Sequence, residues 1–248
     1  IPEGLPATVT IALALAVSRM LRQKALVHRL HSVETLGCAS VICTDKTGTV
    51  TENRMTVRRI ALPYAEYDVT GSSDRIDGEI SGANRSDIDE IMKCAVLCSN
   101  AYLTDGKNGR KTLCGDPTEA ALIVAAEKGG FRRDKLTKEF PRTDEIPFDS
   151  ETRLMTVECR TSAGKMRFTK GSPEAVIKLC GAYRNEQGKN VPLDIRTERR
   201  ITAQAEKMSE DALRVLGFCE ETPSGDRVFL GLMGMIDPPR PEAKKAVK

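Results

Sequence analysis

One short run, residues 45–49 (DKTGT), holds the side chains best suited to chemistry. The Asp45 carboxylate can attack a phosphoryl group and form an aspartyl phosphate. Because the carboxylate and the phosphate are both negative, such a site must supply positive charge and a metal ion. Lys46 offers a cation, and Thr47 and Thr49 offer hydroxyl groups. The sequence contains no Gly-x-x-x-x-Gly-Lys-Ser/Thr loop, so phosphate binding in the P-loop manner is not predicted.

The elements around this run must place Asp45 at the edge of a sheet. Residues 40–44 are small or β-prone, and they are predicted to form a short buried strand that ends at Asp45 and is followed by a tight turn. In open α/β sheets, ligands bind beyond the carboxyl ends of the strands. The sequence therefore predicts an α/β layer with Asp45 in that position.

A long mixed stretch follows, and we expect it to be a large α+β domain inserted into the α/β layer. The chain is expected to leave the layer near Met55 and to return near Ile236, just before the stiff run 237–241 (DPPRP). Asp116 is the expected N-cap of one helix, with Pro117 in its first turn. The expected helices are residues 86–100, 117–128, 172–180 and 198–214, and the expected strands are residues 64–69, 153–159, 165–170 and 228–236.

The N-terminal stretch is apolar. Residues 5–17 are almost wholly apolar, and the only charge before them is Glu3. A full membrane crossing needs ~20 apolar residues, so a buried core helix is the alternative. We favour a partial membrane helix with residues 19–248 on the cytoplasmic side, because basic residues follow the run directly. These basic residues are Arg19, Arg22, Lys24 and Arg29.

Composition limits the partners. The net charge of +3 and the lack of a long basic run argue against nucleic acid. Eight cysteines form no Cys-x-x-Cys pair and only two histidines are present, which argues against zinc and favours free thiols. Cys94 and Cys98, four residues apart on a helical pattern, are expected to be buried.

The run at Asp45 and its flanks, residues 32–37 (SVETLG) and 51–56 (TENRMT), resemble the phosphorylation motif of P-type ATPases of the calcium-pump kind. The resemblance covers nearly the whole chain. It implies that Asp45 is the nucleophile beside Lys46, and that Thr49 contacts phosphate. The Asp45 carboxylate and the Thr47 backbone carbonyl would hold Mg²⁺.

The resemblance also implies a fold and a division of the chain. The fold class is α/β, a dehalogenase-like Rossmannoid phosphorylation domain with a large inserted α+β nucleotide-binding domain. The implied segments are a partial transmembrane helix (1–18), a stalk helix (19–36), the first part of the phosphorylation domain (37–57), the nucleotide-binding domain (58–228), and the return hinge with the start of the second part (229–248). The whole protein would be a multi-pass membrane protein.

Two motifs resemble parts of the family's ATP site. The run KGSPE contains Lys170 and Gly171 and is similar to the ATP-site lysine motif, although a surface lysine beside an N-cap is the alternative. The run GDPTE is similar to a motif in which Glu119 contacts adenine. Asp116 and Glu119 also have the spacing of a capping box, which alone could account for both residues.

Three further residues follow from the resemblance. The run PFDSETRLM would supply Phe148 to stack on adenine and Arg153 as a nearby cation, although Ser150 stands where the family often has arginine. Arg214 resembles a phosphate-binding arginine, with a solvated charge at a helix end as the alternative. Asp237 opens the return hinge, which is expected to serve domain closure and the nucleotide site.

The transported ion is implied by residues 2–6 (PEGLP), which resemble the broken-helix ion motif of calcium pumps. Glu3 and unwound backbone carbonyls would give hard oxygen ligands, which suit Ca²⁺, with Mn²⁺ as an alternative. The expected ligands and partners are therefore ATP, Mg²⁺, a divalent cation and a lipid membrane.

Two other function classes remain open. Dehalogenase-like phosphatases often carry a second Asp where this chain has Thr47, and threonine cannot protonate a leaving group, so a soluble phosphatase is the weaker reading. A non-catalytic nucleotide-binding module is the other alternative. Because the chain lacks Thr-Gly-Asp and Gly-Asp-Gly-x-Asn-Asp motifs, we expect it to bind ATP but barely to phosphorylate itself.

Overall fold

The computed structural model describes residues 4–71, 76–105 and 111–247. The chain forms two compact units, Ile1–Asp45 and Lys46–Lys248. In the first, α1 (Leu5–Arg22) has no buried residue and could cross a membrane by length and composition alone. Glu3 lies outside the described residues.

The expected stalk helix 19–36 is not continuous. The helix α1 ends at Arg22, and α2 (His31–Gly37) begins only after a break. Lys24, in the break, adopts a φ of +64°. This left-handed conformation cannot continue a right-handed helix, so the chain turns there.

The predicted strand at residues 40–44 is absent. The segment has no regular structure, and Val41 and Ile42 are 76% and 80% exposed. A strand needs a neighbour that satisfies its N–H and C=O groups, and none of the described strands pairs with this segment. The prediction of a buried strand is therefore wrong for this chain, because an apolar run does not supply its own partner.

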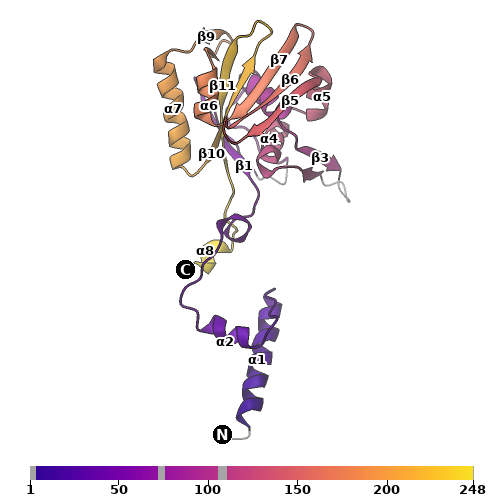
Figure 1. Ribbon diagram of the computed structural model, residues 1–248, viewed down its shortest axis with the longest axis vertical. Coiled ribbons are helices and arrows are strands. Elements are labelled where there is room, and N and C mark those ends of the chain that lie inside the picture. Colours follow the sequence, from indigo (N-terminus) through magenta and orange to yellow (C-terminus); the bar gives the residue numbers. More distant parts are fainter. Residues whose placement is uncertain (1–3, 72–75, 106–110, 248) are drawn as a thin grey trace. The chain divides into compact units, whose positions relative to one another are not determined.

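The second unit is built on one mainly antiparallel sheet (Figure 1). In its described part the strands pair in the order β2-β1-β11-β10-β7-β6-β5, while β8 pairs with β11 in parallel and with β9. A separate hairpin joins β3 and β4. The bounds are β1 (Thr56–Ala61), β2 (Glu66–Asp68), β3 (Tyr102–Asp105), β4 (Lys111–Cys114), β5 (Arg142–Asp149), β6 (Leu154–Thr161), β7 (Gly164–Gly171), β8 (Ala182–Arg184), β9 (Asn190–Pro192), β10 (Arg214–Glu221) and β11 (Arg227–Ile236).

Helices cover both faces of this sheet. The helices α3 (Arg85–Leu97), α4 (Pro117–Lys128) and α5 (Arg133–Glu139) pack on one face. On the other face, α6 (Pro173–Leu179) and α7 (Ile195–Glu210) pack against β10 and β11. A short helix, α8 (Ala243–Ala246), follows the sheet. Apolar side chains on both faces are thereby removed from water, which is the main favourable contribution to folding.

Several sequence predictions are confirmed. The helix α4 has the predicted bounds and Asp116 as its N-cap, and the hairpin of β6 and β7 forms as expected. Cys94 and Cys98 are both fully buried. The expected helix 198–214 is displaced: Asp194 caps an earlier start at Ile195, and the helix ends at Glu210, before β10 begins.

Candidate functional site

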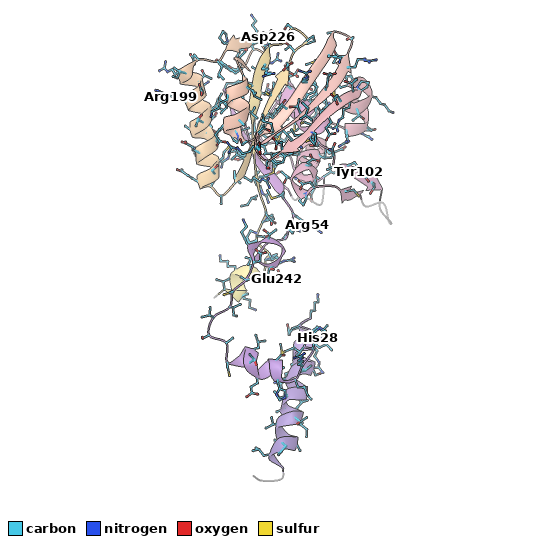
Figure 2. All side chains as sticks on the ribbon, viewed as in Figure 1. His28, Arg54, Tyr102, Arg199, Asp226 and Glu242 are labelled. Atoms are coloured by element: carbon cyan, nitrogen blue, oxygen red, sulfur yellow. The ribbon has the colours of Figure 1, made fainter. Side chains whose placement is uncertain are left out.

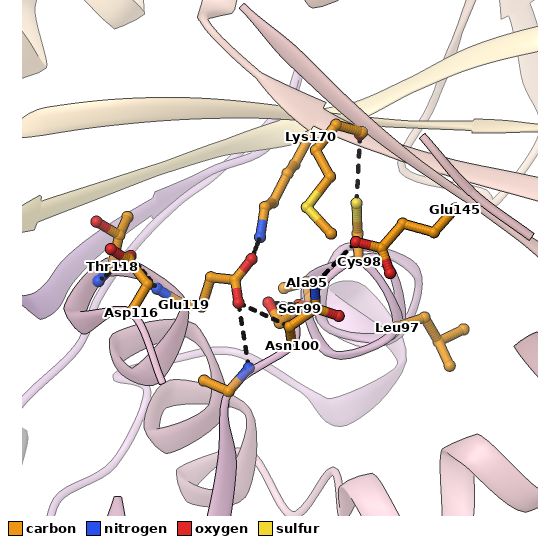
Figure 3. A network of polar contacts seen from close by, with 12 residues as sticks. Ala95, Leu97, Cys98, Ser99, Asn100, Asp116, Thr118, Glu119, Glu145 and Lys170 are labelled. Carbon is orange, nitrogen blue, oxygen red and sulfur yellow. Dashed lines mark hydrogen bonds and ion pairs between the residues drawn. The ribbon is translucent and has the colours of Figure 1, made fainter. Parts of the chain in front are cut away.

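The centre of the candidate site is an ion pair between Lys170, near the end of β7, and Glu119, in the first turn of α4. The Lys170 Nζ lies 2.6 Å from the Glu119 Oε1 (Figure 3). The two side chains are only 9% and 14% exposed. Because removing an ion from water is costly, each of these charges depends on the other. The pair therefore fixes a cation just inside the protein surface.

The second oxygen of Glu119 has backbone partners. Glu119 Oε2 accepts N–H groups from Asn100 at 2.7 Å and Ala101 at 3.1 Å. A capping box would instead direct Glu119 to the backbone N–H of Asp116. Asp116 caps α4 by itself, accepting the N–H groups of Thr118 and Glu119 at 2.8 and 3.3 Å. The described contacts of Glu119 therefore contradict the capping-box alternative.

Gly171 allows β6 and β7 to approach closely beside Lys170. Gly171 pairs with Leu154, and a Cβ atom at Gly171 would lie 2.2 Å from the backbone oxygen of Arg153. No other residue could occupy this position unless the strands moved apart. Gly171 thus helps to set the position of Lys170 relative to the turn before β6.

Phe148 and Arg153 flank that turn. Phe148 is 61% exposed on β5, and the side chain of Arg153 is 56% exposed, with an Nη1 3.8 Å from Glu174. Asp149 accepts the N–H groups of Glu151 and Thr152, and these bonds lower the pKa of its carboxyl. Asp149 pairs with Leu154, which pairs with Gly171. Phe148 on β5 and Lys170 on β7 therefore each lie one residue from the paired row Asp149–Leu154–Gly171.

Arg214 lies three residues before Gly217, which pairs with Gly171 in the neighbouring strand β7. Arg214 is exposed at the first position of β10, opposite Met235, so the prediction that it belongs to a helix is wrong. Ala212, with a φ of +58°, separates it from α7. Figure 2 shows the other end of β10 and β11, where Asp226 lies in the connecting turn.

Asp237 connects the segment that leads into β1 with the segment that follows β11. Its Oδ2 accepts the Thr51 hydroxyl at 2.5 Å, and its Oδ1 accepts the Arg54 N–H at 3.0 Å. Thr56 and Ile236 then face each other at the start of the β1–β11 pairing. Asp237 therefore holds the hinge strands together, and its described contacts do not include the Lys170 pair.

Sequence reasoning missed Asn100, Ala101, Arg142 and Glu145. Asn100 and Ala101 act on Glu119 through backbone N–H groups, and any residue type except proline carries such a group. Arg142 and Glu145 hydrogen-bond to Asn100 from a strand 42 and 45 residues away. No local pattern signals such contacts.

Comparison with known proteins identifies the family. A family model described as "P-type ATPase, cytoplasmic domain N" matches residues 87–242. The chain belongs to the P-type ATPase family. The matched region contains Glu119, Phe148 and Lys170.

Curated cation- and calcium-transporting ATPases align with the entire chain. The calcium-transporting ATPase type 2C member 1 of Homo sapiens is 41% identical, the calcium-transporting ATPase of Bacillus subtilis (strain 168) is 38% identical, and the cation-transporting ATPase pma1 of Synechocystis sp. is 37% identical. The chain spans 27%, 30% and 29% of the lengths of these three relatives, respectively.

In this P-type ATPase chain, the residues after Asp45 form a single turn, η1 (Lys46–Val50). Gly48 has a φ of +78°, which glycine adopts readily. The Lys46 carbonyl accepts the Thr51 N–H at 3.1 Å, and Arg240 donates to the Gly48 carbonyl at 3.1 Å. Thr47 and Thr49 are exposed, while Asp45 ends the first compact unit.

Several thiols are buried in the core of the second unit. All eight cysteines are free, and Cys98 donates to the Met155 carbonyl at 3.4 Å, beside Lys170 (Figure 3). Burial raises the pKa of the Cys98 thiol from 9.0 to about 12. The folded state therefore keeps Cys98 protonated at a pH where the unfolded chain ionises it.

The raised pKa of Cys98 predicts a loss of stability at high pH. The contribution of the protonated Cys98 thiol to the unfolding free energy is intact below pH 9. It is lost as the pH rises from 9 toward 12, because the thiol then ionises in the unfolded chain before it does so in the folded protein. In Cys98→Ser, the difference in unfolding free energy from the wild type should shift by about 1 kcal/mol between pH 8 and 10, in favour of the variant. Urea unfolding at the two pH values measures this shift. The exposed Cys38→Ser is the control, and an equal shift in both variants would contradict the prediction.

Proposed function

We propose that this chain is part of an ATP-driven cation pump that forms an aspartyl phosphate on Asp45. The observation that carries the proposal is the buried Lys170–Glu119 pair together with the exposed Phe148, because Phe148 and Lys170 each lie one residue from the same row of paired strand residues. A fixed cation and an exposed aromatic ring are what an anionic nucleotide with a planar base requires. Relatives named cation- and calcium-transporting ATPases support the same proposal.

In the proposed nucleotide site, adenine stacks on Phe148 and its edge meets Glu119. The ammonium of Lys170 has three donors, of which Glu119 takes one, so the others can bind the nucleotide. Arg153 and Arg214 supply exposed positive charge for the phosphates. Gly171 keeps β6 and β7 close enough for Lys170 to remain in place.

In the proposed phosphoryl transfer, one carboxylate oxygen of Asp45 attacks the terminal phosphorus while the bond to the leaving oxygen breaks. Lys46 reduces the repulsion between the two anions, and Thr49 donates to the transferred group. Asp45 and Thr47 are both exposed and offer oxygen, the donor that Mg²⁺ prefers, so they fit this ion. Mg²⁺, when bound, would neutralise phosphate charge. Thr47 cannot act as an acid, which favours a persistent intermediate over a phosphatase.

The proposed dehalogenase-like domain would receive ATP through closure at the hinge. Asp237 is suited to this role because it links Thr51 to the return strand. Residues 1–18 are proposed to be part of a membrane helix, with residues 19–248 in the cytoplasm. Glu3 is proposed to ligate the transported cation, with Ca²⁺ favoured and Mn²⁺ as the alternative.

The full-length protein in sealed vesicles tests the proposal. We expect Ca²⁺-stimulated ATP hydrolysis together with Ca²⁺ uptake. Stimulation and uptake by Mn²⁺ alone would correct the ion. Phosphate release without a trapped phosphoenzyme would favour a soluble-type phosphatase, whereas unaltered activity in Asp45→Asn would favour a non-catalytic nucleotide-binding module.

Phe148→Ala is expected to weaken ATP binding by about 1–3 kcal/mol, roughly 5- to 150-fold, because the stacking surface is lost. The ring is 61% exposed, so the unfolding free energy should change little. Titration calorimetry on the 248-residue chain measures the affinity. Phe148→Tyr should bind normally, and Ile146→Ala, which removes a 62% exposed apolar side chain from the same strand, is the matched control. Equal affinities in Phe148→Ala and the wild type would remove Phe148 from the site.

A further inference from the structure

The segment that follows α3 is held on both sides. Its N–H groups at Asn100 and Ala101 point to Glu119, as described above. Its carbonyls are bound by two arginines: Arg133 donates to Ser99 and Ala101, and Arg142 donates to Leu97 at 2.5 Å and Ser99 at 3.1 Å. The last carbonyls of a helix lack partners within the helix and carry partial negative charge, so guanidinium groups stabilise this end of α3.

Arg142 also controls the side chain of Asn100. One guanidinium nitrogen, Nη1, donates to Asn100 Oδ1 at 2.6 Å and to Glu145 Oε2 at 2.8 Å. Asn100 Nδ2 completes the ring by donating to Glu145 Oε1 at 2.8 Å. Arg142 therefore fixes the side chain of Asn100 and the carbonyls that precede it, while Glu119 accepts the N–H of Asn100. Figure 3 shows the contacts of Asn100 with Glu119 and Glu145. Lysine lacks the planar fork that makes these simultaneous bonds.

We propose that Arg142 is a positioning residue for nucleotide binding, acting through Asn100 and Glu119 on Lys170. This inference rests on the proposed function of Lys170. Two backbone N–H groups occupy Glu119 Oε2, so the carboxylate has one orientation and presents Oε1 to Lys170. Without the arginine, the segment can move, Glu119 loses these donors, and Lys170 becomes its main partner. Fewer ammonium donors then remain for the nucleotide.

The test compares the ATP affinity of the 248-residue chain by calorimetry in the wild type and three variants: Arg142→Gln, Lys170→Met and the double variant. Arg142→Gln is expected to weaken binding about tenfold in the wild-type background and less than about twofold in the Lys170→Met background. Arg132→Gln is the matched control, because Arg132 is an exposed arginine paired with Asp134, and the ATP affinity of this variant should equal that of the wild type.

Asn100→Ala removes the side-chain contact with Arg142, while Arg142 can still donate to the last carbonyls of α3. This variant tests the positioning role if Arg142→Gln does not fold. It is expected to weaken ATP binding about fivefold, again only when Lys170 is present. Equal losses in both backgrounds, or no loss, would overturn the positioning role while leaving the nucleotide site intact. Absence of ATP binding in the wild type, or wild-type affinity in Lys170→Met, would overturn the proposed site itself and this inference with it.

Discussion

Asp45→Asn in the full-length protein is expected to lower ATP-driven turnover by at least about a thousandfold, because the amide cannot act as the anionic nucleophile. The two side chains have nearly the same shape, and Asp45 is exposed, so neither folding nor ATP binding should be lost. After incubation with radioactive ATP and acid quenching, the wild type should carry a label that hydroxylamine removes. The variant should carry none.

A matched substitution separates this effect from a general loss of charge. Asp226→Asn also exchanges an exposed carboxylate for an amide, but Asp226 lies in the turn between β10 and β11, where Ser224 donates to it at 2.7 Å. Its labelling and turnover should equal those of the wild type. Hydroxylamine-labile label in Asp45→Asn would show that another residue accepts the phosphoryl group.

The sequence predicted those helices and strands whose ends are marked by residues close to them in the chain. The helix α4 was predictable to the residue because Asp116, Pro117 and Gly129 mark its ends by well-understood local chemistry. The hairpin of β6 and β7 was predictable for a similar reason, since Gly164, with a φ of +128°, turns the chain between two runs in which apolar and polar residues mix. In both cases the information lies within a few residues.

Elements that depend on distant partners were not predictable. Residues 40–44 are apolar enough for a strand, but a strand forms only beside another strand. Arg214 follows a charged helical pattern, yet Ala212 turns the chain and β10 pairs with β7 and β11. The position of Arg214 is therefore set by sheet pairing rather than by its neighbours in sequence.

The candidate site shows the same division. Lys170 and Glu119 could be picked out from short motifs, but their pairing across 51 residues could not. The capping-box spacing of Asp116 and Glu119 even favoured a different partner. The orientation of Glu119 is set by the N–H groups of Asn100 and Ala101, which donate to it. Because nearly every residue type carries a backbone N–H, the sequence cannot reveal these donors.

The second large effect is expected from separating the Lys170–Glu119 pair. Lys170→Met leaves the Glu119 carboxylate buried without its cation, which should lower the unfolding free energy by about 3–5 kcal/mol. It should also weaken ATP binding about thirtyfold, because charge-assisted bonds are worth about 2 kcal/mol. Urea unfolding and calorimetry on the 248-residue chain measure the two quantities independently.

The double variant Lys170→Met/Glu119→Gln distinguishes the contribution of Lys170 to stability from its contribution to ATP binding. With both charges removed, neither buried ion lacks a partner, and the glutamine oxygen can still accept the N–H groups of Asn100 and Ala101. Stability should therefore return to near the wild-type value, whereas ATP affinity should stay low because no ammonium remains. Lys165→Met is the control, since it removes a 70% exposed lysine from an ion pair to Glu158, which keeps Arg167 as a partner at 3.2 Å, and it should alter neither quantity appreciably. Recovery of ATP binding along with stability in the double variant would mean that Lys170 serves the fold alone.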